Sequence, residues 1–342
     1  MSLRLTLSIL AAIVCISLVA GRLQADPLPG EELKFIQMPL NGGLPVPIVL
    51  PSGAVSGTPA PFPGHDEAST AYLSQTVPPQ PVLSGPFMAD DFSDKLNTPV
   101  VHVQWWGSYM NQSAVTSGPV KQFLISFESD VPAGPAGNFS HPGVPLLSQV
   151  VSAGALTAGS GTFTETLVPA PATSPDGNLF QYNAELALPF REQANTVYWL
   201  KIVALDPNHV SSTEPGAIQW GWHNRDWGLL DNLAAGPPVP SPGEFNEAPA
   251  GTGPIWHFQD DAVSGSVFIT LPASGGLPLV DQTNFAPTNY LPGIDVPPNS
   301  TELFSKDLAF GLYTNVPEPS TLVLLGLGVL GLVFARRRRC RG

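Results

Sequence analysis

The chain has 342 residues, with 33 Gly, 39 Pro and a formal net charge of −13. Residues 26–315 hold 7 Lys or Arg against 26 Asp or Glu, which gives this part a net charge of −19. A surface this acidic repels the phosphates of nucleic acids and the headgroups of anionic membranes, so nucleic-acid binding is excluded. The high Gly and Pro content indicates a body with many turns.

The first 25 residues have the pattern of a secretory signal peptide. Arg4 supplies a positive start, and an apolar run follows from Leu5 to Ala20 before small and polar residues lead to Ala25. This order is typical of a cleaved export signal and not of a core helix. We expect cleavage after Ala25, so that the mature chain begins at Asp26; a slightly earlier cut is the alternative.

The exported body is predicted to be a linker followed by one ectodomain. Residues 26–80 are rich in Pro and Gly and are predicted to form an entry linker, and residues 81–315 form the ectodomain. Both cysteines, Cys15 and Cys340, lie in the terminal segments. The body therefore has no cysteine for a disulfide or a metal site, although an exported location permits disulfides.

Alternating apolar and polar residues predict strands throughout the ectodomain. Val101, Val103 and Trp105 share one face of such a segment. Residues 196–205 are apolar almost throughout, which is typical of a central strand that is covered on both faces. The predicted strands are Val100–Tyr109, Phe123–Glu128, Gly161–Val168, Phe180–Leu188, Thr196–Leu205, Ile218–Trp222, Ala262–Leu271 and Leu308–Tyr313.

These segments predict an all-β fold, an antiparallel β-sandwich of jelly-roll type. The strands are separated by Gly and Pro turns, and residues 81–315 show no sustained apolar period of 3.6 residues that would indicate crossover helices. Helices are expected only in the signal peptide and in a C-terminal transmembrane segment.

Residues 316–342 consist of three parts in a fixed order. Pro317 and Pro319 flank Glu318 and keep this tripeptide extended, because proline disfavours helix at and before its own position. The uncharged run Leu322–Ala335 suits a helix in lipid. Four consecutive arginines follow, and their charge should keep the C-terminus on the cytoplasmic side of the membrane. They are Arg336, Arg337, Arg338 and Arg339.

This three-part segment resembles the PEP-CTERM sorting signal of exported bacterial proteins, which an exosortase recognises and cuts near the Pro-Glu-Pro motif. The resemblance implies that Pro317, Glu318 and Pro319 form the sorting motif. It also implies that the partners are an exosortase and the secretion machinery. The protein would then pass through an inner-membrane intermediate to the cell surface or extracellular matrix. An ordinary single-span anchor is the alternative, although residues 321–335 are fewer than the about 20 of a spanning helix.

Three short stretches of the body are similar to blocks of an uncharacterised β-rich domain, which occurs in exported bacterial proteins with this C-terminal signal. The stretches are Ala89–Phe92, His102–Tyr109 and Ser140–Gly143. This resemblance implies a β-rich fold and brings no known activity with it.

Aromatic residues gather at two places in the predicted strands. Trp106, Tyr109, Trp222 and Trp227 are candidates for stacking on the sugar rings of an exopolysaccharide, because flat aromatic faces suit the C–H groups of sugars. The simpler interpretation is that these rings fill the core of the sandwich and cover the faces of its sheets.

Acidic residues offer oxygen ligands for a structural Ca²⁺ at Asp90, Asp91 and Asp94, and again at residues 260–261. Neither stretch has the spacing of a calcium-binding loop, so solvated loop carboxylates are the alternative and no cofactor is predicted. The six histidines lack the close spacing of a zinc motif.

No nucleophile elbow, phosphate-binding loop or dinucleotide motif occurs in residues 26–315. We therefore predict a non-enzymatic exported protein of the cell envelope or extracellular matrix, with polysaccharide as a candidate ligand. The alternative hypothesis is a surface glycan hydrolase whose paired catalytic carboxylates the sequence does not identify.

Overall fold

The structure is a computed structural model. It describes residues 27–39, 65–77, 80–110, 113, 118–132, 139–169, 173–174, 177–225, 262–272, 276–288 and 307–315. The predicted signal peptide and the C-terminal segment 316–342 lie outside these residues. Within the described part, no helix is long and apolar enough to span a membrane.

The described part of the chain is built from strands. In chain order they are β1 (Glu31–Gln37), β2 (Asp66–Ala68), β3 (Thr70–Val77), β4 (Gln80–Phe92), β5 (Val100–Tyr109), β6 (Gln122–Val131), β7 (His141–Ala153), β8 (Thr162–Leu167), β9 (Thr173–Ser174), β10 (Gly177–Asn178), β11 (Phe180–Phe190), β12 (Tyr198–Asp206), β13 (Trp220–His223), β14 (Val263–Thr270), β15 (Leu279–Pro287) and β16 (Phe310–Asn315). The prediction of an all-β fold is confirmed.

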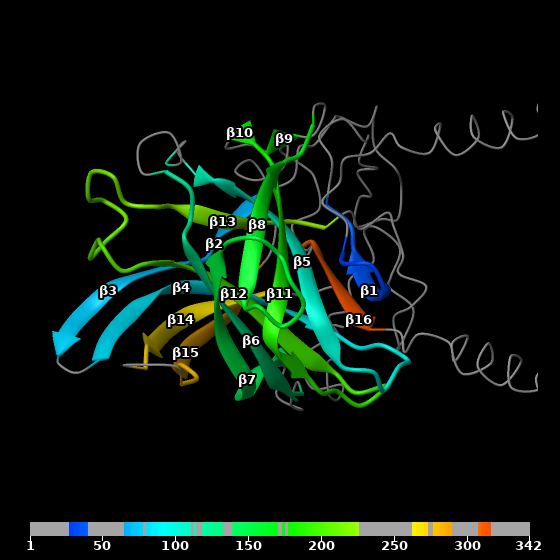
Figure 1. Cartoon of the computed structure of the whole chain (residues 1–342). Coiled ribbons are helices and arrows are strands. Elements are labelled where there is room, and N and C mark those ends of the chain that lie inside the picture. The colour runs from blue at the N-terminus through cyan, green and yellow to red at the C-terminus, as the bar shows by residue number, and fades with distance from the viewer. Residues whose placement is uncertain are drawn as a thin grey trace, which may run out of the picture.

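Fourteen of these strands form one sheet, in the order β1-β16-β5-β11-β8-β7-β6-β12-β3-β4-β14-β15 (Figure 1). β13 pairs with β5 and β2 beside this path, and β12 also pairs directly with β4. The pairing is antiparallel except between β12 and β3 and between β7 and β8, where short parallel contacts occur. The layers of the fold are therefore parts of one sheet rather than two separate sheets.

The sheet curls so that its distant strands share one core. Phe35 of β1 and Phe92 of β4 stand far apart in the strand order, but their ring centroids are 6.0 Å apart. Phe310 of β16 stacks on Phe35 at 5.2 Å, and Trp105 of β5 stacks on Tyr182 of β11 at 5.3 Å. These rings belong to a single buried cluster, which receives side chains from β1, β4, β5, β6, β7, β8, β11, β12, β13 and β16.

The central strands are covered on both faces. Leu200 of β12 lies in the main cluster, and its neighbour Trp199 lies in a second cluster on the opposite face. β6 divides in the same way, with Phe123 in the main cluster and Leu124 in the second. The sequence prediction of a doubly covered strand at residues 196–205 is thus confirmed, since all nine residues of β12 are buried.

The predicted entry linker needs correction. Residues 26–80 contain β1, β2 and β3, and each of these strands pairs with a strand of the ectodomain. β1 is part of the fold, because the ring of Phe35 is buried in the main cluster. The Pro-rich residues 40–64, which dominated the composition of this range, lie outside the described residues.

The first and last described strands lie side by side at one end of the sheet, β1 in blue and β16 in orange (Figure 1). Their antiparallel register sets Glu31 opposite Asn315 and Gln37 opposite Phe310. β16 is therefore held between β1 and β5. The backbone leading into it is fixed as well, because Leu308 N donates to Asp90 Oδ2 at 2.7 Å.

We predict that Phe35→Ala lowers the free energy of unfolding by about 3–5 kcal/mol, because it removes a fully buried ring between Phe92 and Phe310 and leaves a cavity. The matched control is Phe268→Ala on β14, where the side chain is 45% exposed; its cost should be about 1 kcal/mol. Urea unfolding of both variants measures the difference. Equal costs would contradict a core role for β1.

Candidate functional site

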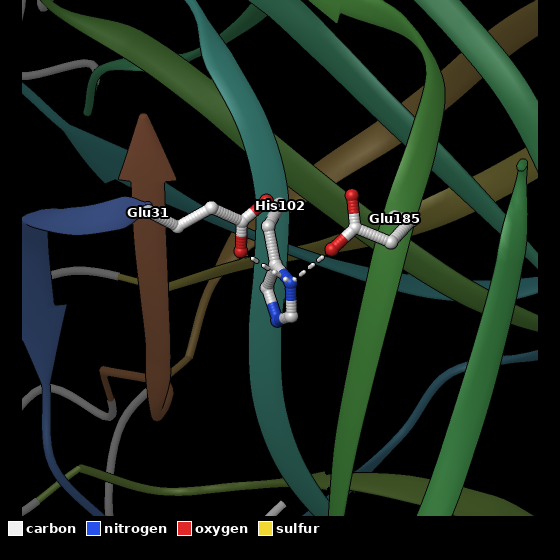
Figure 2. A group of neighbouring side chains, drawn as sticks. All are labelled: Glu31, His102 and Glu185. Carbon is white, nitrogen blue, oxygen red and sulfur yellow. Dashed lines mark hydrogen bonds and ion pairs between the residues drawn. The ribbon is translucent and has the colours of Figure 1, made fainter. Parts of the chain in front are cut away.

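A cluster of ionisable side chains joins β1 to the interior of the sheet. Glu31 starts β1, His102 lies in β5, and Glu185 lies in β11 directly opposite His102 in the strand register. Tyr313 of β16 is the register neighbour of His102 on the other side, with the two rings 5.1 Å apart. Glu31 thus reaches from β1, beyond the intervening β16, to contact β5 (Figure 2).

His102 Nδ1 lies between the two carboxyl groups, 2.8 Å from Glu185 Oε1 and 3.2 Å from Glu31 Oε2 (Figure 2). Its other nitrogen, Nε2, is 3.2 Å from Asn183 Oδ1. The three ionisable side chains are at most 2% exposed. Because both ring nitrogens face oxygens that accept hydrogen bonds, the geometry fits a doubly protonated imidazolium.

The environment of His102 raises its pKa. Burial by itself lowers the pKa, but the hydrogen bonds and negative charges of Glu185 and Glu31 outweigh it and raise the pKa to about 9. The imidazolium therefore persists at neutral pH and binds two carboxyl groups from different strands. The cluster acts as an ionic clamp that holds β1 in place over β16.

The same three residues could hold a metal ion, since their ligand atoms lie within 4.8 Å of one another. One imidazole nitrogen and two carboxylate oxygens suit Zn²⁺ or Mn²⁺, and Asn183 could accept the remaining ring N–H of His102. A cation would have to replace the proton on Nδ1. No local sequence pattern marks this set, because its members come from three distant strands; His102 and Glu185 alone are 83 residues apart.

Three of the four aromatic residues predicted to contact glycans are buried. Trp106 is 1% exposed, Tyr109 3% and Trp222 0%. Tyr109 is held by a hydrogen bond to Glu165, and Trp222 Nε1 donates to Ala309 O at 2.9 Å. These three predictions are corrected: the rings fill the interior of the curled sheet and have no face free for a sugar. Trp227 lies outside the described residues.

From the sequence, the acids at the end of β4 were expected to be either calcium ligands or solvated loop carboxylates. The structure shows that they are not solvated. Asp90 and Asp91 are 0% exposed and Asp94 is 2% exposed. Asp90 accepts hydrogen bonds from the backbone N–H groups of Asp91 and Leu308, at 2.9 and 2.7 Å. Both oxygens of the Asp90 carboxylate are therefore bound by backbone N–H groups. The second acidic stretch, residues 260–261, lies outside the described part.

A second buried set resembles a hydrolase triad in composition only. Ser108 Oγ donates to Asp66 Oδ2 at 2.7 Å, and His223 Nδ1 lies 2.8 Å from Asp66 Oδ1. A serine nucleophile needs the imidazole between the hydroxyl and the carboxylate, whereas here the carboxylate stands between the other two groups. All three side chains are buried. The set joins β2, β5 and β13.

The comparisons with known proteins identify the C-terminal segment. Residues 315–339 match the PEP-CTERM protein-sorting motif. This span contains Pro317, Glu318, Pro319 and the arginine cluster at 336–339, all outside the described residues. The protein is therefore of the exported class that an exosortase sorts at the membrane, and its resemblance to that class is confirmed.

The body is assigned by a second match. Residues 54–252 match the family described as "Domain of unknown function (DUF7901)", and the chain belongs to this family. The expectation of an uncharacterised domain in the body is confirmed. No curated protein and no solved structure matches the chain.

The His102 clamp predicts a stability that falls in alkaline solution. The folded pKa of about 9 lies above the ordinary 6.5, so the stabilisation is complete below about pH 6.5 and is lost as the pH rises through 9. The shift corresponds to about 3 kcal/mol. Urea unfolding of the wild type and His102→Gln at about pH 6 and pH 9.5 isolates this contribution, because only the wild type should lose it.

The matched control for this measurement is His209→Gln, since the His209 side chain is 24% exposed and pairs with Asp206 at the end of β12. It should retain the pH dependence of the wild type. A His102→Gln protein with the same pH dependence as the wild type would contradict the clamp.

Removal of metal ions distinguishes the proton from a bound cation at Glu31, His102 and Glu185. Because the proton on Nδ1 already provides the positive charge, we predict that dialysis against a chelator leaves the thermal midpoint at pH 7 unchanged. The midpoint is measured before and after dialysis, and again after Zn²⁺ is added back. A midpoint that falls after dialysis and recovers with Zn²⁺ would show that a cation fills the cluster.

Proposed function

We propose that the protein is a non-catalytic component of the cell envelope or extracellular matrix. Its sorting signal follows directly after the last described strand of a folded β-domain. The observation that carries this proposal is the position of β16, which ends at Asn315, where the sorting motif match begins. Asn315 is paired with Glu31, so the paired part of β16 reaches the first residue of the motif match.

The spacing sets where the domain sits during processing. Seven residue steps separate Asn315 from Leu322, the first residue of the apolar run, and an extended chain of this length spans at most about 25 Å. If residues 322–335 are held in the inner membrane, the end of β16 lies within that distance of the lipid. The exosortase then cuts near Pro317-Glu318-Pro319 inside this gap and releases the domain toward the surface or matrix.

The N-terminal steps follow the same route. The protein enters the secretion pathway through residues 1–25, and cleavage after Ala25 leaves Asp26 as the first residue. Only a short stretch then precedes Glu31, where β1 begins. Both processing sites therefore flank the β1–β16 pair, with the ionic clamp of Glu31, His102 and Glu185 between them.

The proposal does not assign a glycan to the domain. The described aromatic candidates Trp106, Tyr109 and Trp222 are buried, so binding of exopolysaccharide would have to use other residues. A glycan array with the mature protein separates the hypotheses. Binding without turnover would support a polysaccharide ligand, turnover would support the surface glycan hydrolase, and neither result alters the sorting proposal.

Replacement of both prolines of the motif tests the processing step. We predict that Pro317→Ala/Pro319→Ala protein stays in the membrane fraction with Arg336–Arg339 attached, because the extended motif that the exosortase recognises is lost. Cell fractionation and mass spectrometry of the C-terminal peptide give the measurement. Ser320→Ala/Thr321→Ala is the neighbouring control and should be processed. If the segment were an ordinary anchor, neither double substitution would change the fractionation. A mature wild-type protein that still carries Arg336–Arg339 would refute processing.

A further inference from the structure

A second ionisable cluster lies under β1, at Lys34. Lys34 Nζ is 3.2 Å from Asp94 Oδ2, contacts Glu192 Oε1, and donates to the backbone carbonyl of Thr98. The three side chains come from separate parts of the chain: Lys34 from β1, Asp94 just after β4, and Glu192 just after β11. The fold thus brings one amine and two carboxyl groups together.

The cluster is shielded from solvent. The side chains of Lys34, Asp94 and Glu192 are 0%, 1% and 2% exposed. Water is thus excluded from a site that holds one amine and two carboxyl groups, and separated charges are costly there.

Glu192 is suited to carry a proton. Burial, the hydrogen bond to Asp94 and the charge of Asp94 raise the pKa of Glu192 to about 8, against the opposing effect of Lys34. A protonated carboxyl group beside Asp94 is a general acid aimed at the other carboxyl group of the site. Asp94 Oδ1 in turn accepts the backbone N–H of Leu96 at 2.7 Å, so this oxygen is already bound by a fixed donor.

We propose that Lys34 and Asp94 become joined by an amide bond that the folded protein forms itself, with Glu192 as the group that transfers protons. The reactants are the Lys34 ammonium and the Asp94 carboxylate, and the products are a side-chain amide and one water. No oxidant, cofactor or second enzyme is required. The inference concerns the body of the protein and does not depend on the proposed sorting route.

The atoms balance in three steps. Lys34 Nζ gives a proton to Asp94 Oδ2 and becomes a neutral amine, which attacks Cγ of Asp94. The negative charge then gathers on Oδ1, where the N–H of Leu96 stabilises it as an oxyanion donor does. Glu192 delivers its proton to Oδ2, the Cγ–Oδ2 bond breaks, and water leaves. Glu192 recovers a proton from Nζ, so it ends as it began.

Burial also supplies the driving force. In water, the charged amine and carboxylate are well solvated, which opposes their condensation. In the core, the same charges have lost their water, and a neutral amide removes both of them at once. Proximity also favours the reaction, because the fold holds the Lys34 amine next to the Asp94 carboxyl carbon. The reaction is then unimolecular and needs no encounter between two molecules.

The bond would fasten β1 permanently. It would connect the first described strand to the segment between β4 and β5, at a place where residues 26–315 offer no cysteine for a disulfide. Lys201 provides the contrast within the same protein. It is also buried and is 2.7 Å from Glu128 Oε1, but its other side-chain partner is the amide of Gln282. Among the described residues, no second carboxyl group contacts Lys201 to act as an acid toward Glu128.

The test is a peptide map of the full-length protein recovered from its host, digested under denaturing conditions with a protease that cuts between Lys34 and Asp94. The expected result is a branched peptide that contains both residues and weighs one water less than the two separate peptides together. Recovery of Lys34 and Asp94 in unlinked peptides, from protein that was folded before digestion, would overturn the proposal.

Two variants assign the roles. Asp94→Ala should abolish the branched peptide, and Glu192→Gln should reduce its yield at least tenfold while the protein keeps its β-type circular dichroism. Lys95→Ala, which alters the exposed neighbour of Asp94, is the control and should give the wild-type yield. A Glu192→Gln protein linked as fully as the wild type would refute the role of Glu192. The wild-type map alone decides whether the bond exists, even where a variant does not fold.

Discussion

The arrangement of the sheet depends on β1 lying along β16. β16 has β5 on one side, and without β1 its other side would be a row of unpaired N–H and C=O groups at a sheet edge. β1 also supplies Phe35, whose ring stacks on Phe310 and reaches Phe92 beyond the curl. β1 therefore pairs the backbone groups on the second side of β16 and also completes the core beside it. A strand near the start of the exported chain protects the strand that leads into the sorting signal.

Charge fixes the register of this pair. Glu31 and Lys34 are on the same short strand, and each enters a separate buried cluster, one with His102 and Glu185 and the other with Asp94 and Glu192. A slip of one residue would turn each side chain to the opposite face and leave buried charges without partners. Apolar contacts alone would tolerate such a slip more easily. The polar groups make the position of β1 specific, in addition to whatever they contribute to stability.

The sequence predicted those parts of the fold that have local causes. The alternation of Val101, Val103 and Trp105 predicted β5 with its observed bounds, and the apolar run at 196–205 predicted the two-sided burial of β12. β1 was missed because its short apolar pair stands beside a long Pro-rich stretch, and β7 because prolines interrupt its alternation. Periodicity also cannot separate an exposed aromatic face from a buried one when a sheet curls over both sides.

The polar clusters could not be predicted from the sequence, because no local pattern of residues marks them. Glu31, His102 and Glu185 meet only because β1, β5 and β11 are brought together by the strand order, and the same holds for the cluster around Lys34. The sorting signal is the opposite case, since its three parts adjoin one another in the chain and a single membrane enzyme recognises them in that order. The sorting signal was therefore predicted from adjacent residues, whereas the buried clusters, which only the fold assembles, were not.

The place of β16 also sets the timing of export against folding. A chain that crosses the membrane N-terminus first delivers β1 at the start and β16 at the end, with almost the whole body between them. Their pairing is the longest-range contact between strands in the fold, so it is expected to form late. The β1–β16 pair can form only after residue 315 has crossed, since Asn315 is paired with Glu31. The last strand that the fold needs and the first residues of the sorting motif are therefore delivered together, because β16 ends where the motif match begins.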